Sequence, residues 1–259
     1  MTHVLTHDLI ATARPEDELK WDMSRGDLEL AVHMEQMCKI EGHVLDLAAG
    51  GLRNSALFAR HDMDVTAVDI NTDVLESARA SLREQDAQLA TRITGVTETV
   101  DSFLRCGIQP DYDVVLMSEF PHHAGSREQA LETAHLAYGK VRPGGYFWLR
   151  TVSTLDDTYG RLERNLKKDP HAPIKCGTED EHTFQVKCNC SGFEKVEPQT
   201  FFDPYDIHDA LGLGDANIVY QRLAPTIGYP NIMGGRLHAK PEYAGRQFGY
   251  ISILAQKTG

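Results

Sequence analysis

Two aspartates at the ends of consecutive apolar segments could bind a nucleotide-like ligand. Asp46 belongs to the apolar segment 43–48, which a loop of small residues follows, and Asp69 ends the next apolar segment, 23 residues after Asp46. Small residues let a backbone approach a ligand closely. The spacing puts the second carboxylate where the hydroxyls of a ribose would lie. We therefore expect a ribose-bearing ligand here.

The loop after Asp46 departs from the pattern that binds dinucleotides. That pattern is G-x-G-x-x-G, and residues 48–53 read Ala-Ala-Gly-Gly-Leu-Arg, which fails at two of the three glycines. The carboxylate of Asp46 would also repel a pyrophosphate, whereas it would attract a cationic ligand. A nicotinamide or flavin dinucleotide is therefore disfavoured.

Further reactive side chains follow the fourth expected strand, where residues 118–123 read Ser-Glu-Phe-Pro-His-His. A histidine titrates near neutral pH and could act as a general base. The alternative is that the histidine packs under the next helix or caps it. Glu119 could instead anchor a substrate amine. The candidate catalytic residues are Glu119, His122 and His123.

Four residues outside this run are candidates for a substrate site. Arg150, at the end of the fifth expected strand, could pair with a substrate carboxylate through two hydrogen bonds, or form a surface salt bridge. Trp21 and Tyr159 flank the central segments and could cap the site, with core packing as the alternative for Trp21. Tyr229 belongs to a loop, 224–247, that is long for a connection, and we expect it to help cover the substrate.

Three of the five cysteines form the pattern C-x11-C-x-C at Cys176, Cys188 and Cys190, with His182 between them. Thiolates and imidazole suit zinc and similar ions. The spacing is not that of a zinc knuckle or ribbon, however. Because the cysteine count is odd and no export signal is present, reduced thiols in a cytosol are the preferred interpretation. We predict no metal site and a cytoplasmic location.

The elements that must position these side chains alternate between strand and helix. Apolar strands that alternate with helices indicate a parallel sheet covered on both faces. Right-handed crossovers place the carboxyl ends of its strands at one edge, where ligands bind. Strands are expected at 43–48, 64–70, 91–96, 112–118 and 146–151, and a turn at 143–145. One helix is expected over 54–60. A second begins after a cap at Asn71 or Thr72 and ends near 85, and a third begins after a cap at Ser126 and ends near 141.

The remaining segments follow a different pattern. Residues 28–37 have apolar residues at helical spacing. Residues 183–188 and 193–197 alternate in polarity, which indicates an antiparallel hairpin. A helix is expected over 204–213 and strands over 216–223 and 249–255.

The overall composition excludes several functional classes. The chain has 259 residues, 41% of them hydrophobic, and a net charge of −12 from 38 acidic and 26 basic residues. An acidic chain is poorly suited to bind a phosphate backbone. No apolar run approaches the roughly 18–20 residues that span a bilayer. We expect a small-molecule substrate as partner, neither nucleic acid nor membrane, and leave a homodimer open.

These motifs, in this order, make the sequence resemble the class I S-adenosylmethionine-dependent methyltransferases. Residues 44–51 look like motif I, 65–70 like motif II, 112–116 like motif IV, and 141–146 like the turn before strand five. The resemblance covers roughly 42–151 and the closing strand. The run 53–59, with 65–69 after it, is most similar to the tellurite-resistance type of small-molecule methyltransferase.

The resemblance implies S-adenosyl-L-methionine as cofactor and a role for each matching residue. The loop 48–51 would touch the methionine part, Asp69 the ribose hydroxyls and Ile70 the adenine. Val96 stands where the family commonly has an acid, so its contact would be through the backbone. Ser118 and Glu119 would face the transferring methyl. The predicted cofactor-binding residues are Asp46, Ala48, Ala49, Gly50, Asn54, Asp69, Ile70, Val96, Thr97 and Ser118.

The resemblance also implies the fold class and the organisation of the chain. We expect an α/β fold, a Rossmann-like three-layer sandwich with a seven-stranded, mostly parallel sheet and an antiparallel last strand. A single methyltransferase domain over 1–259 would comprise an N-terminal helical cap (1–42), the cofactor-binding core (43–151), an inserted substrate lid (152–202) and the completion of the sheet (203–259).

The predicted function is transfer of a methyl group from S-adenosylmethionine to a small-molecule acceptor. One alternative is an enzyme of the same fold that uses this cofactor for other chemistry. Another is a non-catalytic, cofactor-binding partner subunit. Residues 118–121 lack the Asn-Pro-Pro-Tyr-like run typical of methylation at amino groups of nucleobases or glutamine.

Overall fold

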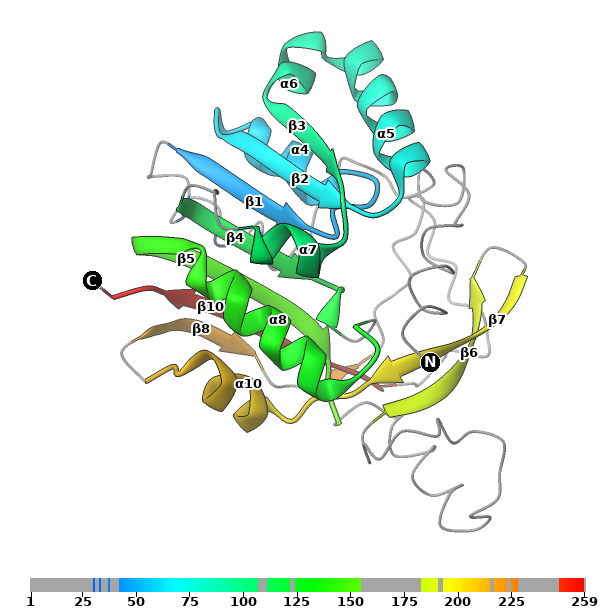
Figure 1. Ribbon diagram of the computed structural model, residues 1–259, viewed down its shortest axis with the longest axis vertical. Coiled ribbons are helices and arrows are strands. Elements are labelled where there is room, and N and C mark those ends of the chain that lie inside the picture. Colours follow the sequence, from blue (N-terminus) through cyan, green and yellow to red (C-terminus); the bar gives the residue numbers. More distant parts are fainter. Residues whose placement is uncertain are drawn as a thin grey trace.

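The computed structural model shows a twisted sheet with helices on both faces (Figure 1). It describes residues 42–106, 111–121, 124–154, 183–190, 193–214, 217–222, 225–227 and 247–258, together with Leu30, His33 and Met37.

Seven strands follow one another across the main sheet, as predicted. The first five run parallel, and the last strand of the chain, β10, is antiparallel to both of its neighbours. A short strand, β9 (Pro225–Ile227), also pairs with β10, so the expectation of a loop from 224 was wrong at these residues. The spatial order is β3 (Ile93–Thr97), β2 (Asp64–Asp69), β1 (His43–Leu47), β4 (Tyr112–Ser118), β5 (Val141–Val152), β10 (Gln247–Gln256) and β8 (Ile218–Arg222).

Strand side chains alternate between two apolar cores, one on each face of the sheet. On β4, Leu116 joins the core that α4 (Arg53–Ala59), α5 (Thr72–Gln85) and α6 (Ala87–Thr91) cover; we call this side the α4 face. Its neighbour Met117 joins the core that α7 (Val100–Arg105), α8 (Arg127–Gly139) and α10 (Pro204–Leu211) cover; we call that side the α8 face. In Figure 1, α7, α8 and α10 lie in front of the sheet. The three-layer arrangement is therefore the predicted one.

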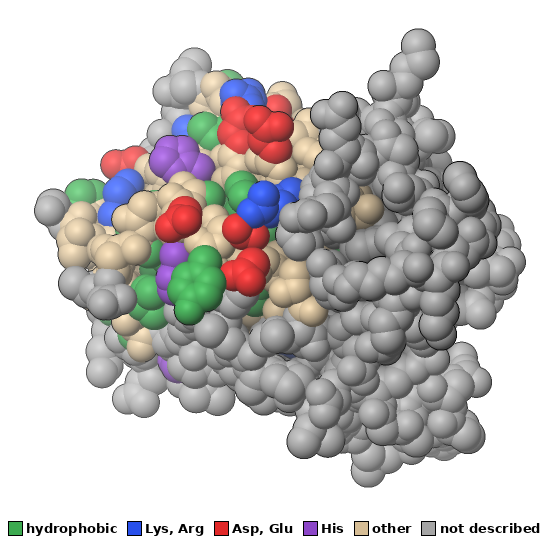
Figure 2. Space-filling model, turned by 90° about the horizontal axis from the view of Figure 1, so that it is seen from below, with side chains coloured by type: hydrophobic (Ala, Val, Ile, Leu, Met, Phe, Trp, Pro, Cys, Tyr) green, Lys and Arg blue, Asp and Glu red, His purple; other side chains and the backbone are tan. Residues whose placement is uncertain are grey.

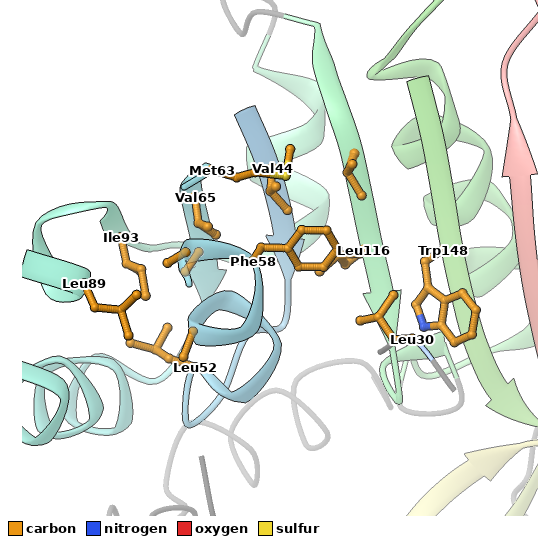
Figure 3. Close-up of a cluster of buried hydrophobic side chains, with 14 of the residues drawn as sticks. Leu30, Val44, Leu52, Phe58, Met63, Val65, Leu89, Ile93, Leu116 and Trp148 are labelled. Carbon is orange, nitrogen blue, oxygen red and sulfur yellow. The ribbon is translucent and has the colours of Figure 1, made fainter. Parts of the chain in front are cut away.

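The N-terminal segment contributes to the core of the α4 face. Leu30 and Met37 are helical and fully buried there, as the apolar spacing predicts. His33 is also helical, and its ring centroid lies 6.3 Å from that of Trp148 on β5. Figure 3 shows Leu30 beside Trp148, with Phe58 of α4 next to Leu116. Leu30 and His33 thus pack beside Trp148 of β5 on this face.

The helix caps follow the sequence closely. The side chain of Asn71 accepts a hydrogen bond from the backbone N–H of Val74 and caps α5, and Ser126 caps α8 through the N–H of Gln129. Helix α10 begins with a capping box between Asp203 and Asp206.

Two expected boundaries were wrong in detail. Strand β5 begins at Val141 rather than 146, because the expected turn lies within it, at a register shift opposite β4 between Tyr112 and Val114. The third strand begins at Ile93 because Thr91 ends the short helix α6.

The predicted hairpin forms a two-stranded sheet of its own. Strands β6 (Thr183–Cys190) and β7 (Phe193–Thr200) are antiparallel and lie beyond the carboxyl ends of β4 and β5 (Figure 1). The chain leaves β5 and returns at one place, where Phe202 N donates to Val152 O (3.2 Å) and Thr154 N donates to Phe202 O (3.0 Å). The stretch of chain that contains β6 and β7 therefore begins and ends at the carboxyl edge of the sheet.

Candidate functional site

Asp46 is a buried carboxylate at the end of β1. Its residue is 2% exposed, and its Oδ2 accepts a hydrogen bond of 2.6 Å from the hydroxyl of the fully buried Ser55 on α4. Burial raises the pKa of Asp46 to about 6, against the opposing effects of the Ser55 hydrogen bond and the positive charge of Arg53. This carboxyl group therefore titrates close to neutral pH and would gain from a cationic neighbour.

The loop after β1 turns sharply in the left-handed backbone region. Ala48 has φ 57°, Gly50 φ 46° and Leu52 φ 61°. Only the glycine adopts such values without steric cost. The loop is held to the next strand by Ala49 N, which donates to Val68 O at 3.0 Å. Strain kept in place by such hydrogen bonds is typical of functional loops.

Asp69, at the end of β2, binds the loop that follows β1. Its Oδ2 accepts a hydrogen bond of 2.8 Å from Gly50 N, and its Oδ1 accepts one of 2.9 Å from Asn71 N. The residue is 7% exposed, and burial raises its pKa although backbone N–H groups lower it. Asp46 and Asp69, which were expected to contact one ligand, thus lie at the same edge of the sheet. Asp69 also holds the loop that begins just after Asp46.

The end of β3 adjoins Asp69. Thr97 pairs with Asp69 in the parallel register and is exposed, and Glu98 N donates to Asp69 O at 3.0 Å. The Glu98 carboxylate accepts a hydrogen bond from the Ser102 hydroxyl. Val96 is partly buried and packs against the core of the α8 face.

Two other predicted cofactor residues lie beside this group. Ile70 follows Asp69 directly and is partly buried. Asn54 is 7% exposed and lies in the first turn of α4, next to the buried Ser55.

The ends of β4 and β5 bring Glu119 and Arg150 together. Glu119 N donates to Arg150 O at 2.9 Å, and Arg150 Nε lies 3.1 Å from Glu119 Oε1. Glu119 has a left-handed backbone, with φ 61°. Arg150 forms the salt bridge that was the alternative to a substrate contact, but this residue is within β5 and buried rather than at the surface. The two residues predicted to contact a substrate separately form one ion pair.

Strand register places these side chains in one row. Asp69 pairs with Thr97, and Arg150 pairs with Ser118 on one side and Ser252 on the other. Because alternate residues share a face, Asp69 follows Ala67, and Arg150 follows Trp148, on the α4 face. Asp46 is on the same face and pairs with Ala67 and Leu116. The site is therefore a polar row at the carboxyl edge of the α4 face.

Some predicted site residues lie outside the described residues: Trp21, His122, His123, Tyr159 and Tyr229. The same holds for Cys176 and for the side chains of Cys188 and Cys190. Within the described part of the chain, no group of three or more His, Cys, Asp or Glu residues could hold a metal ion.

Ser55 is a site residue that the sequence reasoning did not single out. Its hydroxyl donates to the carboxylate of Asp46, nine residues earlier in the chain. The signal was present as a small polar residue in the first turn of the helix after motif I, on a face that must pack against β1.

Comparison with known proteins finds methyltransferases that are similar to the central part of the chain. A family model described as a methyltransferase domain matches residues 45–147. This segment therefore resembles a methyltransferase domain. A curated relative, a ubiquinone biosynthesis O-methyltransferase from Photorhabdus laumondii, is 32% identical over 110 residues, which are 42% of each chain. The chain thus matches less than half the length of the curated relatives.

Solved structures share the methyltransferase fold over most of the chain. A SAM-dependent methyltransferase from Methanosarcina mazei superposes with a TM-score of 0.60 at 17% identity, covering 83% of this chain and 92% of that one. A magnesium protoporphyrin IX methyltransferase from Synechocystis, with bound SAH, gives a TM-score of 0.58 at 13% identity, covering 89% and 80%. The fold of the methyltransferase domain thus extends beyond the matched segment.

Proposed function

We propose that this protein transfers a methyl group from S-adenosylmethionine to a small-molecule acceptor. The observation that carries the proposal is the hydrogen bond of 2.8 Å from Gly50 N to Asp69 Oδ2. It joins the glycine-containing loop after β1 to the acid that ends β2, within the methyltransferase domain. A ribose and the chain attached to it would be held by these two segments together.

The residues present fit this cofactor chemically. Carboxylate oxygens accept hydrogen bonds, and those of Asp69 face the loop that would lie beside a ribose. The Asp46 carboxyl group, 2% exposed, provides a negative charge for a cationic ligand on the same face. The acidic net charge of −12 agrees with a cationic cofactor. We infer that Ala48, Ala49 and Gly50 would approach its methionine part through their backbone.

The chain's own contribution to catalysis would be alignment and the exclusion of water. The bound cofactor supplies a methyl group that its sulfonium centre already activates. Asp69 and the loop 48–51 would fix the donor, and Ser118, 8% exposed at the end of β4, would face the acceptor. A general base is needed only where the acceptor carries a proton at working pH.

Oxygen is the acceptor atom that we favour, because the matched curated relative is an O-methyltransferase by name. A hydroxyl acceptor would need a base. In the structure the Glu119 carboxylate pairs with Arg150, with Oε1 3.1 Å from Nε, and a carboxylate released from this pair into water is a weak base for a hydroxyl, so Glu119 is a poor candidate. His122 and His123 then stay the predicted bases.

The subtype of methyltransferase and the division of the chain into parts stay predictions from the sequence. The tellurite-resistance type rests on the run 53–59, and the division into cap, core, lid and sheet completion rests on the segment pattern. Every helix in the described ranges is too short or too polar to cross a membrane. In the described part of the face that Figure 2 shows, basic side chains stand beside acidic ones.

Calorimetric titration tests the proposal directly. S-adenosylmethionine and S-adenosylhomocysteine should bind with one-to-one stoichiometry, and NADH, the matched control with a pyrophosphate, should not. Mass spectrometry with methyl-labelled cofactor and a panel of phenols and carboxylic acids should then detect the labelled product. Binding of NADH in place of both S-adenosyl compounds would overturn the proposal. Cofactor binding without any labelled product across the panel would favour the partner-subunit alternative.

A further inference from the structure

Arg150 is a largely buried cation. It is 8% exposed on the α4 face of β5 and lies beyond the apolar row of Leu116, Trp148 and Leu254. A buried guanidinium without a partner charge is strongly unfavourable. Arg150 therefore requires an anionic partner, and Glu119 is such a partner in the structure.

Glu119 is held against Arg150 in a strained conformation. Its backbone is left-handed, with φ 61°, which is sterically unfavourable in a residue other than glycine. Arg150 restrains it twice, since Arg150 O accepts from Glu119 N at 2.9 Å and Arg150 Nε lies 3.1 Å from Glu119 Oε1. Strain that surrounding contacts maintain at the edge of a site is typical of a functional position.

The pair is open on the side of the carboxylate. The side chain of Glu119 is 35% exposed, whereas that of Arg150 is 10% exposed. A ligand arriving from solvent therefore meets the carboxylate first and can take its place against the guanidinium. Replacement by another anion keeps Arg150 neutralised, and Glu119 turns to water, where a carboxylate is well solvated.

The position of the pair in the sheet suits the acceptor rather than the cofactor. From β2, which carries Asp69, the order of strands is β2, β1, β4 and β5. Three strand spacings put Arg150 roughly 14 Å from Asp69 along the row. Ser118, on β4 beside Arg150, lies between the cofactor segments and the pair. A group bound by Arg150 would therefore lie about one strand spacing beyond the reacting end of the cofactor.

On this basis, and resting on the proposed function, we propose that Arg150 recognises a negatively charged oxygen group, of the carboxylate kind, on the methyl acceptor. Glu119 is its internal competitor, which holds the guanidinium until the acceptor arrives. An acceptor amine held by Glu119 is the opposite assignment. It would take the Glu119 carboxylate away from its ion pair with the buried Arg150, so the geometry disfavours it.

Three probes of one shape and different charge test this assignment. Binding of benzoate, benzamide and benzylamine is measured by ligand-observed NMR, with and without S-adenosylhomocysteine. In the wild-type protein benzoate should bind roughly ten-fold or more tightly than benzamide, the effect of one hydrogen bond between charged groups. Glu119→Gln removes the competitor and should tighten benzoate several-fold while leaving benzamide unchanged. Arg150→Gln should abolish the preference, and Arg150→Lys, which keeps the charge, should retain part of it.

Several results would overturn the inference. One is equal or tighter binding of benzamide by the wild-type protein, and another is tightest binding of benzylamine, lost in Glu119→Gln. The wild-type and Glu119→Gln measurements decide the matter even where Arg150→Gln fails to fold. Binding of S-adenosylhomocysteine without a preference for benzoate overturns this inference alone. A preference for benzoate without binding of S-adenosylhomocysteine supports the anion site and overturns the proposed function.

Discussion

Gly50 and Asp69 are joined by a hydrogen bond of 2.8 Å from the Gly50 N–H to Asp69 Oδ2, so the loop after β1 is positioned by the end of β2. The other carboxylate oxygen accepts from Asn71 N at 2.9 Å, next to the cap of α5. The Asp69 side chain therefore sets the relative positions of the loop after β1, the end of β2 and the start of α5. Loss of this side chain should weaken cofactor binding by more than the loss of its direct contact with the cofactor.

We predict that Asp69→Asn weakens binding of S-adenosylhomocysteine by roughly ten-fold to one-hundred-fold, the loss of about 1.5–3 kcal/mol for a hydrogen bond to a charged group. The amide has one acceptor oxygen, whereas both Asp69 oxygens accept from backbone N–H groups. Asp64→Asn, at the other end of β2 and with a 59% exposed side chain, is the matched control and should bind as the wild type does. Equal effects of the two variants in calorimetry would contradict the prediction.

A second prediction concerns Asp46 and pH. Its pKa is raised from 3.8 to about 6 by burial, so the folded state holds its proton over a range where the unfolded chain has lost it. The contribution of protonated Asp46 to the free energy of unfolding is fully present below pH 3.8 and is lost as the pH rises to about 6. Asp46→Asn should therefore raise the free energy of unfolding at pH 7.5 by an amount on the order of 1–3 kcal/mol.

The same substitution should weaken binding of the cofactor. The asparagine side chain would keep an oxygen for the Ser55 hydroxyl but lose the charge that attracts a cation. Denaturant unfolding of both proteins at pH 4 and pH 7.5 measures the first effect, and calorimetry with S-adenosylmethionine, against its uncharged product S-adenosylhomocysteine, measures the second. A stability difference that does not grow between pH 4 and pH 7.5, or equal losses for the two ligands, would argue against this role of Asp46.

Much of the fold could be predicted because local sequence and tertiary structure agree there. The strands β1 and β4 are mostly apolar and, apart from His43 at the start of β1, are buried on both faces. Asn71 and Ser126 cap the helices that their residue types predict. The short helices α6 and α7, of 5 and 6 residues, were missed because neither is long enough to show a helical period.

The candidate site was predictable residue by residue but not as a set of contacts. Asp46 and Asp69 were found by their spacing along the chain. Glu119 and Arg150 come from different strands, and their ion pair depends on the register in which Ser118 lies opposite Arg150. A one-residue change in register would turn Arg150 to the α8 face. Sequence alone therefore assigned the two residues separate partners.

A third prediction concerns the strain of the loop after β1. Ala48 has φ 57°, whereas Ala49 does not have a positive φ, and both pack against the core. Replacing either alanine by glycine removes one methyl group and adds chain entropy, but only Ala48→Gly relieves a left-handed alanine. Ala48→Gly should therefore leave the protein about 1 kcal/mol more stable than Ala49→Gly does. Thermal unfolding of the two variants checks this, and the reverse order would contradict it.

A fourth prediction contrasts Gly139, the last residue of α8, with Gly145, within β5. A Cβ added at Gly145 would lie 2.7 Å from the backbone oxygen of Asp113, which cannot move without disturbing the pairing of β4 and β5. Gly145→Ala should therefore lower the free energy of unfolding by about 1–3 kcal/mol. At Gly139, the last residue of α8, a Cβ would meet nothing within 4 Å, and Gly139→Ala should raise stability by about 0.5–1 kcal/mol. Both changes add the same methyl group to neighbouring parts of the chain. Opposite shifts in the denaturation midpoint would therefore attribute the loss of stability in Gly145→Ala to the close approach at Asp113. Shifts of the same sign would refute this prediction.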